Sequence, residues 1–512
     1  MKILGAAIGE CVHVAGVYNF LRLAAEAKHE TVFLGPAVDT TALIKALRET
    51  NPDVVGLSYR LSPDAAERLL TEVRAALVAA GEGHRRFVFG GTPPVARVAR
   101  TAGWFEKVFD GTEGDEKVLA WLRAAVRPRD PLIHGQAVPS GAREEGRPEE
   151  PASLPPQSLV ERIEAQKPYP LIRHHFGLPS LADTISGAAE IAEAGVLDVI
   201  SLGPDQNAQE SFFRPEEMDS SQDGAGGVPV RRPEDFRAIY EASRRGNYPL
   251  VRSYSGTRDL IKMAGMLKET INLAWGAIPL FWYSELDGRS TRRLEDTIAE
   301  AQQAMAWHAR AGIPVEANEA HHWGLRDAPD AVVVAAGFLA AYNAMKVGVR
   351  EYVAQFMFNT PAATSFRMDL AKMLAMLDLI SVLEEAGRFR VWRQTRAGLA
   401  SFPADLDMAK GQLASSTMLQ MALKPHIVHV VAHCEADHAA TPTDIIEAVK
   451  IARGVIKNAI HGLPDLTSDP VVQERRRDLA QEARAVLEGL QGLAPEGRDA
   501  WSDPEVLGRS VR

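Results

Sequence analysis

Cysteine is scarce in this chain, whose 512 residues include only Cys11 and Cys434. Two cysteines cannot build a disulfide scaffold, so we expect a reducing, cytoplasmic location. Long apolar runs are lacking as well, since no stretch approaches the roughly 20 apolar residues of a membrane span. The apolar start of MKILGAAIGE is too short for a signal peptide. We therefore expect neither a membrane partner nor export.

Positive charge is also in deficit, because 57 Lys and Arg stand against 67 Asp and Glu, giving a net charge of −10. Nucleic-acid binding needs a basic face, so we expect no nucleic-acid partner. The chain does have the composition of a soluble globular protein, with 46% hydrophobic and 24% charged residues. Its length exceeds one ordinary core and predicts two or more domains.

Residues 1–126 alternate short apolar runs with amphipathic helical stretches. This alternation predicts an α/β domain with a doubly wound parallel sheet, Rossmann-like and of the flavodoxin type. Ligands of such sheets bind at the carboxyl ends of the strands, near a topological switch point. The expected strands are 2–9, 30–35, 53–59, 85–91 and 107–111.

The rest of the chain divides into three segments. Residues 127–160 are rich in Pro, Gly and charge and predict a flexible linker. Eight strand–helix units over 161–465 predict a (β/α)₈ TIM barrel, and 466–512 predict a helical tail. The expected barrel strands are 169–176, 197–203, 248–255, 270–278, 313–319, 352–358, 389–395 and 426–433.

Four short motifs fall at the carboxyl ends of the first domain's strands: CVHVAG, LSYRL, FGG and DGT. Together they resemble the cobalamin-binding domain of mutases and methionine synthase. The resemblance implies that His13 is the lower ligand of cobalt, and that a pocket for the cofactor's nucleotide tail is lined by Gly16, Ser58, Gly90, Gly91, Gly111 and Thr112. In two places the chain departs from the family. Cys11 replaces an aspartate that orients the imidazole, and a thiol is a weaker acceptor; Arg60 replaces a leucine.

Arginines and histidines gather at the predicted strand ends of the barrel, where catalytic groups of this fold lie. An arginine fork suits a carboxylate, which it binds through two parallel hydrogen bonds. The stretches RDLIKMAGMLKETINLAWGAI, AGIPVEANEAHHWG, FRVWRQTRAGLASFPADLDMAKG and VAHCEADHAATPT resemble the epsilon subunit of glutamate mutase.

This second resemblance implies a role for individual barrel residues. Arg173 and Arg252 would hold a substrate carboxylate, Glu319 or His321 would move a proton, and Glu435 would contact the adenosyl ribose. Tyr283 matches a family tyrosine and is grouped with the cofactor-binding residues. The family has a third arginine, but none is found in the matching stretch GPDQNAQESF of this chain. The family's ammonium-binding glutamate is replaced by Ala274. These changes indicate a substrate other than glutamate.

The two resemblances imply an adenosylcobalamin-dependent mutase that rearranges the carbon skeleton of a small carboxylate by a radical mechanism. The sequence does not decide whether the chain forms a homodimer. Three other functions also stay open: a cobalamin methyltransferase, a non-catalytic cobalamin sensor or carrier, and a metal-dependent barrel hydrolase. The hydrolase would draw its ligands from His429, His433, Cys434 and His438.

Overall fold

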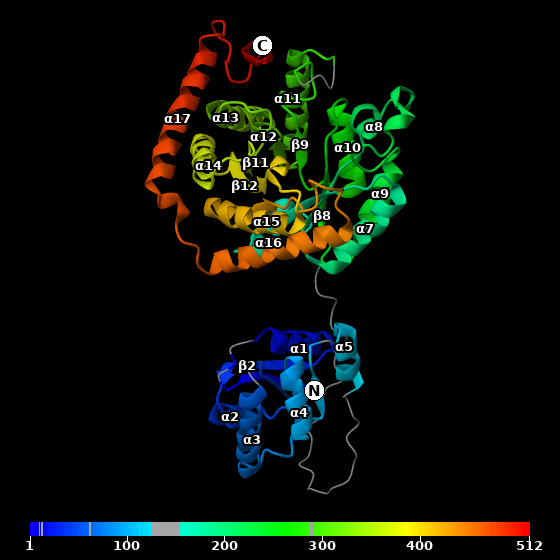
Figure 1. Cartoon of the computed structure of the whole chain (residues 1–512). Coiled ribbons are helices and arrows are strands. Elements are labelled where there is room, and N and C mark those ends of the chain that lie inside the picture. Colours follow the sequence, from blue (N-terminus) through cyan, green and yellow to red (C-terminus); the bar gives the residue numbers. More distant parts are fainter. Residues whose placement is uncertain are drawn as a thin grey trace, which may run out of the picture. The chain divides into compact units, whose positions relative to one another are not determined.

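The computed structural model describes residues 1–9, 11, 14–60, 63–111, 113–124, 154–286 and 291–511. The chain forms two compact units, Met1–Glu145 and Gly146–Arg512, drawn in Figure 1. The first unit holds five parallel strands in the order β2-β1-β3-β4-β5. Its strands are β1 (Lys2–Ile8), β2 (Glu30–Val38), β3 (Val54–Ser58), β4 (Arg86–Gly90) and β5 (Lys107–Phe109). Its helices are α1 (Ala15–Glu26), α2 (Thr40–Thr50), α3 (Pro63–Ala79), α4 (Pro93–Ala102) and α5 (Asp115–Ala124).

Helices cover both faces of this sheet. On one face, α1 and α5 pack on a buried cluster that includes Ile3, Val17 and Leu122. On the other, α2, α3 and α4 pack on a cluster that includes Leu43 and Leu70. The doubly wound fold is therefore confirmed. The strand order reverses between β1 and β3, so the loops after these two strands flank the switch point where ligands bind.

The second unit contains an eight-stranded parallel sheet in the order β8-β7-β6-β13-β12-β11-β10-β9. The strands are β6 (Leu171–Phe176), β7 (Val199–Leu202), β8 (Leu250–Ser253), β9 (Gly276–Ile278), β10 (Val315–Ala317), β11 (Glu351–Phe358), β12 (Arg390–Ala397) and β13 (Ile427–His429). The barrel strands that come first and last in the sequence, β6 and β13, pair directly. The backbone N–H of Ala274 donates to the carbonyl oxygen of Val251 at 2.9 Å and links the segment before β9 to β8. The predicted barrel is confirmed as a nearly closed one.

Helices surround this barrel, as Figure 1 shows. They are α6 (Leu159–Gln166), α7 (Leu181–Ala194), α8 (Gln206–Ser211), α9 (Pro233–Ala242), α10 (Leu260–Ile271), α11 (Leu294–Arg310), α12 (Ala320–Gly324), α13 (Asp330–Lys346), α14 (Phe366–Ser381), α15 (Leu406–Gln420), α16 (Pro442–Gly462), α17 (Pro470–Gln491) and α18 (Pro504–Val511). Short 3₁₀ turns lie at η1 (Pro215–Glu217), η2 (Ser220–Gln222), η3 (Leu399–Ser401), η4 (Met421–Leu423) and η5 (Leu466–Ser468). Polar side chains begin many of the helices; Asp405, for example, accepts the backbone N–H of Met408 at the start of α15.

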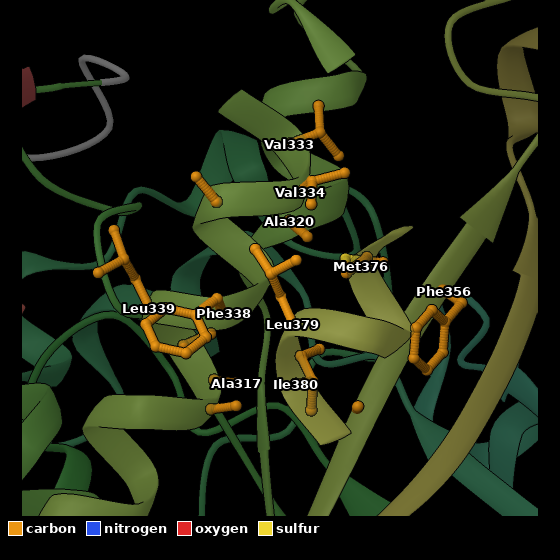
Figure 2. Packing of buried hydrophobic residues seen from close by; sticks show 14 of the residues in the cluster. Ala317, Ala320, Val333, Val334, Phe338, Leu339, Phe356, Met376, Leu379 and Ile380 are labelled. Atoms are coloured by element: carbon orange, nitrogen blue, oxygen red, sulfur yellow. The ribbon is translucent and has the colours of Figure 1, made fainter. Parts of the chain in front are cut away.

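Three apolar clusters hold the barrel in shape. Trp275, Trp392 and Ile427 fill its amino end, where α6 covers it with Leu159. The largest cluster joins β10 and β11 to α13 and α14, and Figure 2 shows part of its packing around Phe338. Helix α17, which begins four residues into the predicted tail segment 466–512, packs its buried side chains on the same cluster.

Most predicted barrel strands are shorter in the structure than the sequence pattern indicated, and two of them differ most. The first, expected over 270–278, starts only at Gly276, because α10 continues to Ile271 and ends where Asn272 adopts a left-handed conformation (φ 46°). The last, expected over 426–433, ends at His429. The backbone N–H of Ala432 then donates to the Glu435 side chain, so the chain turns away from the sheet. His433 therefore lies beyond the strand that was predicted to carry it.

Among the described residues, no helix combines the length and the hydropathy that crossing a bilayer requires.

Candidate functional site

A cavity of about 520 Å³ lies in the first unit, at the carboxyl ends of β3, β4 and β5 beside the start of α1. Five of the residues predicted to bind a cofactor line it together, although they come from separate parts of the chain. They are Gly16, Ser58, Gly90, Gly91 and Gly111. Arg60 and the aromatic rings of Phe20 and Phe109 line it too, and these were not assigned to the site from the sequence.

Three glycines of this cavity differ in what a side chain at their position would meet, or in their backbone conformation. A Cβ at Gly90 would meet no atom within 4 Å, so a side chain there would project into open space beside the cavity. A Cβ at Gly91 would lie 2.8 Å from the carbonyl oxygen of Tyr59, which only glycine avoids. Gly111 has a φ of 84°, the left-handed region that glycine adopts without strain. The wall is therefore open backbone that a bulky ligand can approach closely.

The rim after β5 is fixed by a side chain that the sequence analysis did not single out. Glu113 Oε2 accepts the backbone N–H groups of Asp110 at 3.0 Å and of Gly111 at 3.2 Å. Asp110 in turn accepts Nη2 of Arg100 at 2.7 Å. These bonds hold the rim in one shape, as a preorganised binding site requires.

His13, the predicted cobalt ligand, and Thr112, a predicted pocket residue, lie outside the described residues. Cys11 is described and is fully buried in the apolar cluster of β1, β2 and β3. Its backbone N–H donates to Ile8 at 3.3 Å, and its carbonyl oxygen accepts from Ala37 at 3.0 Å. Cys11 thus packs as a small core residue, two positions before His13 in the sequence.

In the barrel, a fully buried carboxylate holds two of the predicted site residues together. Arg173 Nη1 donates to Glu316 Oε2 at 3.1 Å, and Arg252 Nη1 lies 3.9 Å from the same oxygen. Trp275 Nε1 also donates to it, at 2.7 Å. Burial opposes ionisation of Glu316, but the two guanidinium groups outweigh it and lower its pKa.

The two arginines differ in what they can still bind. Arg173 also donates to Ser201 Oγ at 2.8 Å, to Gln394 Oε1 at 2.6 Å and to His175 Nε2 at 3.2 Å, so its donors are used within the protein. Burial and the charge of Arg252 lower the pKa of Arg173 to about 9. In contrast, Nε and Nη2 of Arg252 are buried and have no hydrogen-bond partner among the described residues. Arg252 is therefore the arginine with donors left for a ligand.

A group of histidine and tyrosine rings follows these arginines along the strands. His175 Nε2 faces the Tyr254 hydroxyl at 3.1 Å, and the two rings stack with centroids 5.1 Å apart. The His429 ring lies 4.6 Å from His175. Burial, with the charges of Arg173 and other arginines, holds the pKa of His175 and His429 well below 6.5. These imidazoles are therefore neutral near pH 7.

Glu319 and His321 occupy the end of β10, as predicted. Glu319 is fully buried, and its oxygens accept the backbone N–H of Phe281 at 3.1 Å and Nε1 of Trp323 at 2.7 Å. Burial nevertheless raises the pKa of Glu319 to about 8. His321 is buried with Nδ1 unpartnered among the described residues, and burial, His322 and Arg396 keep its pKa well below 6.5. Near neutral pH, Glu319 is thus protonated and His321 is neutral.

Glu435 lies in the turn after β13. Its Oε1 is 3.0 Å from His174 Nε2 and 2.9 Å from the backbone N of Ala432. The Ala432 N–H is also 3.1 Å from His174 Nε2. We assign the Ala432 N–H to the Glu435 carboxylate. Both ring nitrogens of His174 can then donate to oxygen, one to Glu435 and the other to the carbonyl of His175. Burial raises the pKa of Glu435, but His174 and the other partners outweigh it and lower that pKa.

Two further residues line the mouth of the barrel. Tyr283 has a φ of 64° and borders a small space together with Tyr254 and Asn318. Arg396 lies one residue beyond the strand that the sequence predicted over 389–395, and the sequence analysis did not single it out. Inward positions alternate along β12 from Trp392 to Gln394 to Arg396, and this period of two could have revealed it. The one hydrogen bond described for the Arg396 side chain runs from Nε to the carbonyl oxygen of Ala397, at 3.3 Å.

The histidines considered for a hydrolytic metal do not gather. Cys434, His438 and Asp444 do place ligand atoms within 4.8 Å of one another, but His429 and His433 are not part of this group. Asp444 Oδ2 already accepts the backbone N–H and the hydroxyl of Thr441 as the cap of α16. Burial raises the pKa of Cys434 to about 12, so the thiol is not ionised. This geometry favours a helix cap over a hydrolytic metal centre.

Comparison with known proteins bears on the first unit. Residues 1–119 match the family model described as the B12 binding domain. The N-terminal unit is a B12-binding domain. No curated protein matches the chain. Cobalamin binding is thus supported for a domain whose cavity is lined by five of the predicted residues.

Two solved structures are similar to parts of the chain. One is a cobalamin-binding protein from Desulfitobacterium hafniense DCB-2, with 27% identity over 24% of this chain and a TM-score of 0.21; the match spans little more than half of that protein, 57%. The other is a truncated 3-deoxy-D-arabino-heptulosonate 7-phosphate synthase from Thermotoga maritima, with 11% identity, coverage of 58% of this chain and 88% of that one, and a TM-score of 0.32. At these scores neither adds to the assignment.

A side chain placed at Gly90 tests the cavity of the B12-binding domain. We expect Gly90→Leu to weaken cobalamin binding by about tenfold or more, because the leucine would occupy space that the ligand needs. Gly114→Leu is the matched control, since a Cβ there also meets no atom within 4 Å but Gly114 does not line the cavity. Equilibrium dialysis with cobalamin measures both. Equal affinities in the two folded variants would contradict this placement of the site.

The raised pKa of Glu319 predicts a pH-dependent stability. Between the unfolded value of 4.5 and about 8, the folded protein keeps this proton while the unfolded chain loses it, so stability falls as pH rises. Glu319→Gln removes the effect. From about pH 5.5 to about pH 7.5, wild type should lose about 2 to 3 kcal/mol relative to the variant. Urea unfolding at both pH values measures the difference, and parallel changes in the two proteins would refute it.

Proposed function

We propose that the chain is an adenosylcobalamin-dependent mutase that rearranges the carbon skeleton of a small carboxylate-bearing substrate. The observation that carries the proposal is the pairing, in one chain, of a B12-binding domain with a barrel whose interior holds buried arginines and neutral imidazoles. Arginine is the side chain best suited to hold a carboxylate in a fixed orientation. The resemblance to glutamate mutase supports the same function.

The cavity of the first unit suits the cofactor's tail. Ser58, Gly90, Gly91 and Gly111 would hold it, since the cavity is lined partly by exposed backbone and the position of a Gly90 Cβ is free. By the family resemblance His13 would ligate the cobalt and Thr112 would join the pocket. When bound, the adenosyl form supplies a carbon radical by homolysis of its cobalt–carbon bond.

Barrel residues would bind and orient the substrate. Arg252 would bind its carboxylate through Nε and Nη2, the two donors without a partner. Arg173, whose donors are bound to Glu316, Gln394, Ser201 and His175, acts as a positioning residue. Glu319 and His321 differ in protonation near neutral pH and are suited to moving a proton during rearrangement. Glu435 stays the proposed contact for the adenosyl ribose.

Electron paramagnetic resonance (EPR) separates radical chemistry from methyl transfer. The full chain, loaded anaerobically with adenosylcobalamin, is frozen with and without a panel of small carboxylic acids. We expect a coupled cobalt(II)–radical signal with at least one acid, because homolysis leaves two unpaired electrons. A protein that binds the cofactor but gives no signal with any acid, and instead accepts or donates a methyl group, would overturn the proposal in favour of a methyltransferase.

Cobalt ligation by His13 has its own spectroscopic test. Protein labelled with ¹⁵N-histidine and loaded with cobalt(II) cobalamin should show the doublet splitting of a ¹⁵N ligand. The cofactor's own benzimidazole would give a ¹⁴N triplet instead. His13→Ala should lose the doublet, whereas His84→Ala should keep it because His84 is an exposed residue bonded to Gly81. A triplet in labelled wild type would rule out histidine ligation.

A further inference from the structure

We propose that the barrel takes a small dicarboxylate without an amino group, one end bound by Arg252 and the other by Arg396. This inference rests on the proposed function, whose substrate it specifies. No resemblance assigns Arg396 a role. The inference follows from two stacked layers of side chains inside the barrel.

The lower layer is tied together by direct bonds. It contains Arg173, Arg252, Glu316 and Gln394, with Gln394 also donating to Gln355 Oε1 at 3.1 Å. Its only carboxylate is bonded to Arg173, which leaves the Nε and Nη2 groups of Arg252 without an acceptor among the described residues. Buried donors of a charged group are rarely left unpaired unless a ligand completes them.

The upper layer lies two residues further along the same strands. His175 follows Arg173, Tyr254 follows Arg252, Asn318 follows Glu316 and Arg396 follows Gln394. Two residues of strand correspond to about 6.6 Å. The layer is continuous with the arginine below, because Arg252 Cζ lies 5.5 Å from the Tyr254 ring, which stacks on His175. Arg252 on β8 and Arg396 on β12 therefore lie in adjacent layers, which the proposed dicarboxylate would bridge.

The charges of these layers require more than one negative group. Arg173 and Arg252 are buried and Arg396 is half-buried, and Glu316 is the carboxylate bonded to the first of these three cations. Glu435 also faces Arg396, but His174 is its hydrogen-bonded partner. Uncompensated buried charge is strongly unfavourable. A dicarboxylate would pair with both Arg252 and Arg396, whereas a monocarboxylate would leave one of them without a carboxylate from the ligand.

Neither Glu319 nor Glu316 is a good acceptor for an ammonium group. Both oxygens of Glu319 already accept N–H groups. Glu316 Oε1 has no hydrogen bond, but Arg173 and Arg252 lie within 3.9 Å of the other oxygen of that carboxylate. A third cation there would be repelled by both. Ala274 supplies only a backbone N–H, which is bonded to Val251.

Calorimetry on the full chain without cofactor tests the inference. The ligands are 2-methylsuccinate, glutarate, glutamate, butyrate and inorganic phosphate. We expect a dicarboxylate to bind at least about tenfold more tightly than butyrate, glutamate or phosphate. Arg396→Gln should reduce dicarboxylate affinity about tenfold and leave butyrate affinity unchanged, and Arg396→Lys should restore part of it. Arg390→Gln is the control, because Arg390 is exposed at the other end of β12 and pairs with Glu164.

Each result has one meaning. Tighter binding of glutamate, butyrate or phosphate, no binding of any acid, or an Arg396→Gln variant that binds like wild type would overturn the inference. A normal thermal melt and normal cobalamin binding by Arg396→Gln exclude a folding defect. The proposed function can fail separately. Dicarboxylate binding without a radical signal would reject the mutase but support the dicarboxylate site. A radical signal with an amino acid as the preferred ligand would support the mutase but reject the dicarboxylate site.

Discussion

One buried ion cluster determines what the barrel can bind. Glu316 sits in the interior with no exposed surface and is bonded to Arg173, while Arg252 stands 3.9 Å away. Removing charges from water is costly, so a buried carboxylate persists only if cations and hydrogen bonds replace its hydration. Here the cations outnumber it. Burial, together with this excess of positive charge, keeps the neighbouring histidines neutral, and two donors of Arg252 have no partner among the described residues.

The cavity of the B12-binding domain depends on a different constraint, which is the absence of side chains. Gly90 and Gly91 end β4, and Gly111 follows β5, at an edge of the sheet next to the switch point. Glu113 fixes the last of these turns through two backbone N–H groups. A rigid wall of backbone lets a large ligand approach without displacing side chains, which lowers the ordering cost of binding. The two units thus offer two different kinds of site, a cavity lined by backbone in the first and a buried cluster of arginines in the second.

Much of this architecture could be predicted from the sequence because its signals are local. Alternating apolar runs and helical stretches specify both parallel sheets, and strand ends then place Ser58 and the glycines at one edge. The side-chain contacts inside the barrel were harder to predict, because the residues that meet there are far apart in the sequence. Arg173 and Gln394 are 221 positions apart, and Arg173 and Glu316 are 143 apart. No local pattern indicates that the donors of Arg173 are already used, or that Arg396 rather than Arg393 points inward.

The most direct test of the whole account is a crystal structure of the full chain with adenosylcobalamin and 2-methylsuccinate. The account predicts the cofactor's nucleotide tail in the cavity beside Ser58 and Gly90, and His13 at the cobalt. It also predicts one carboxylate of the diacid on Nε and Nη2 of Arg252 and the other on Arg396. A corrin bound elsewhere on the first unit, or a barrel interior without the diacid at saturating concentration, would contradict it.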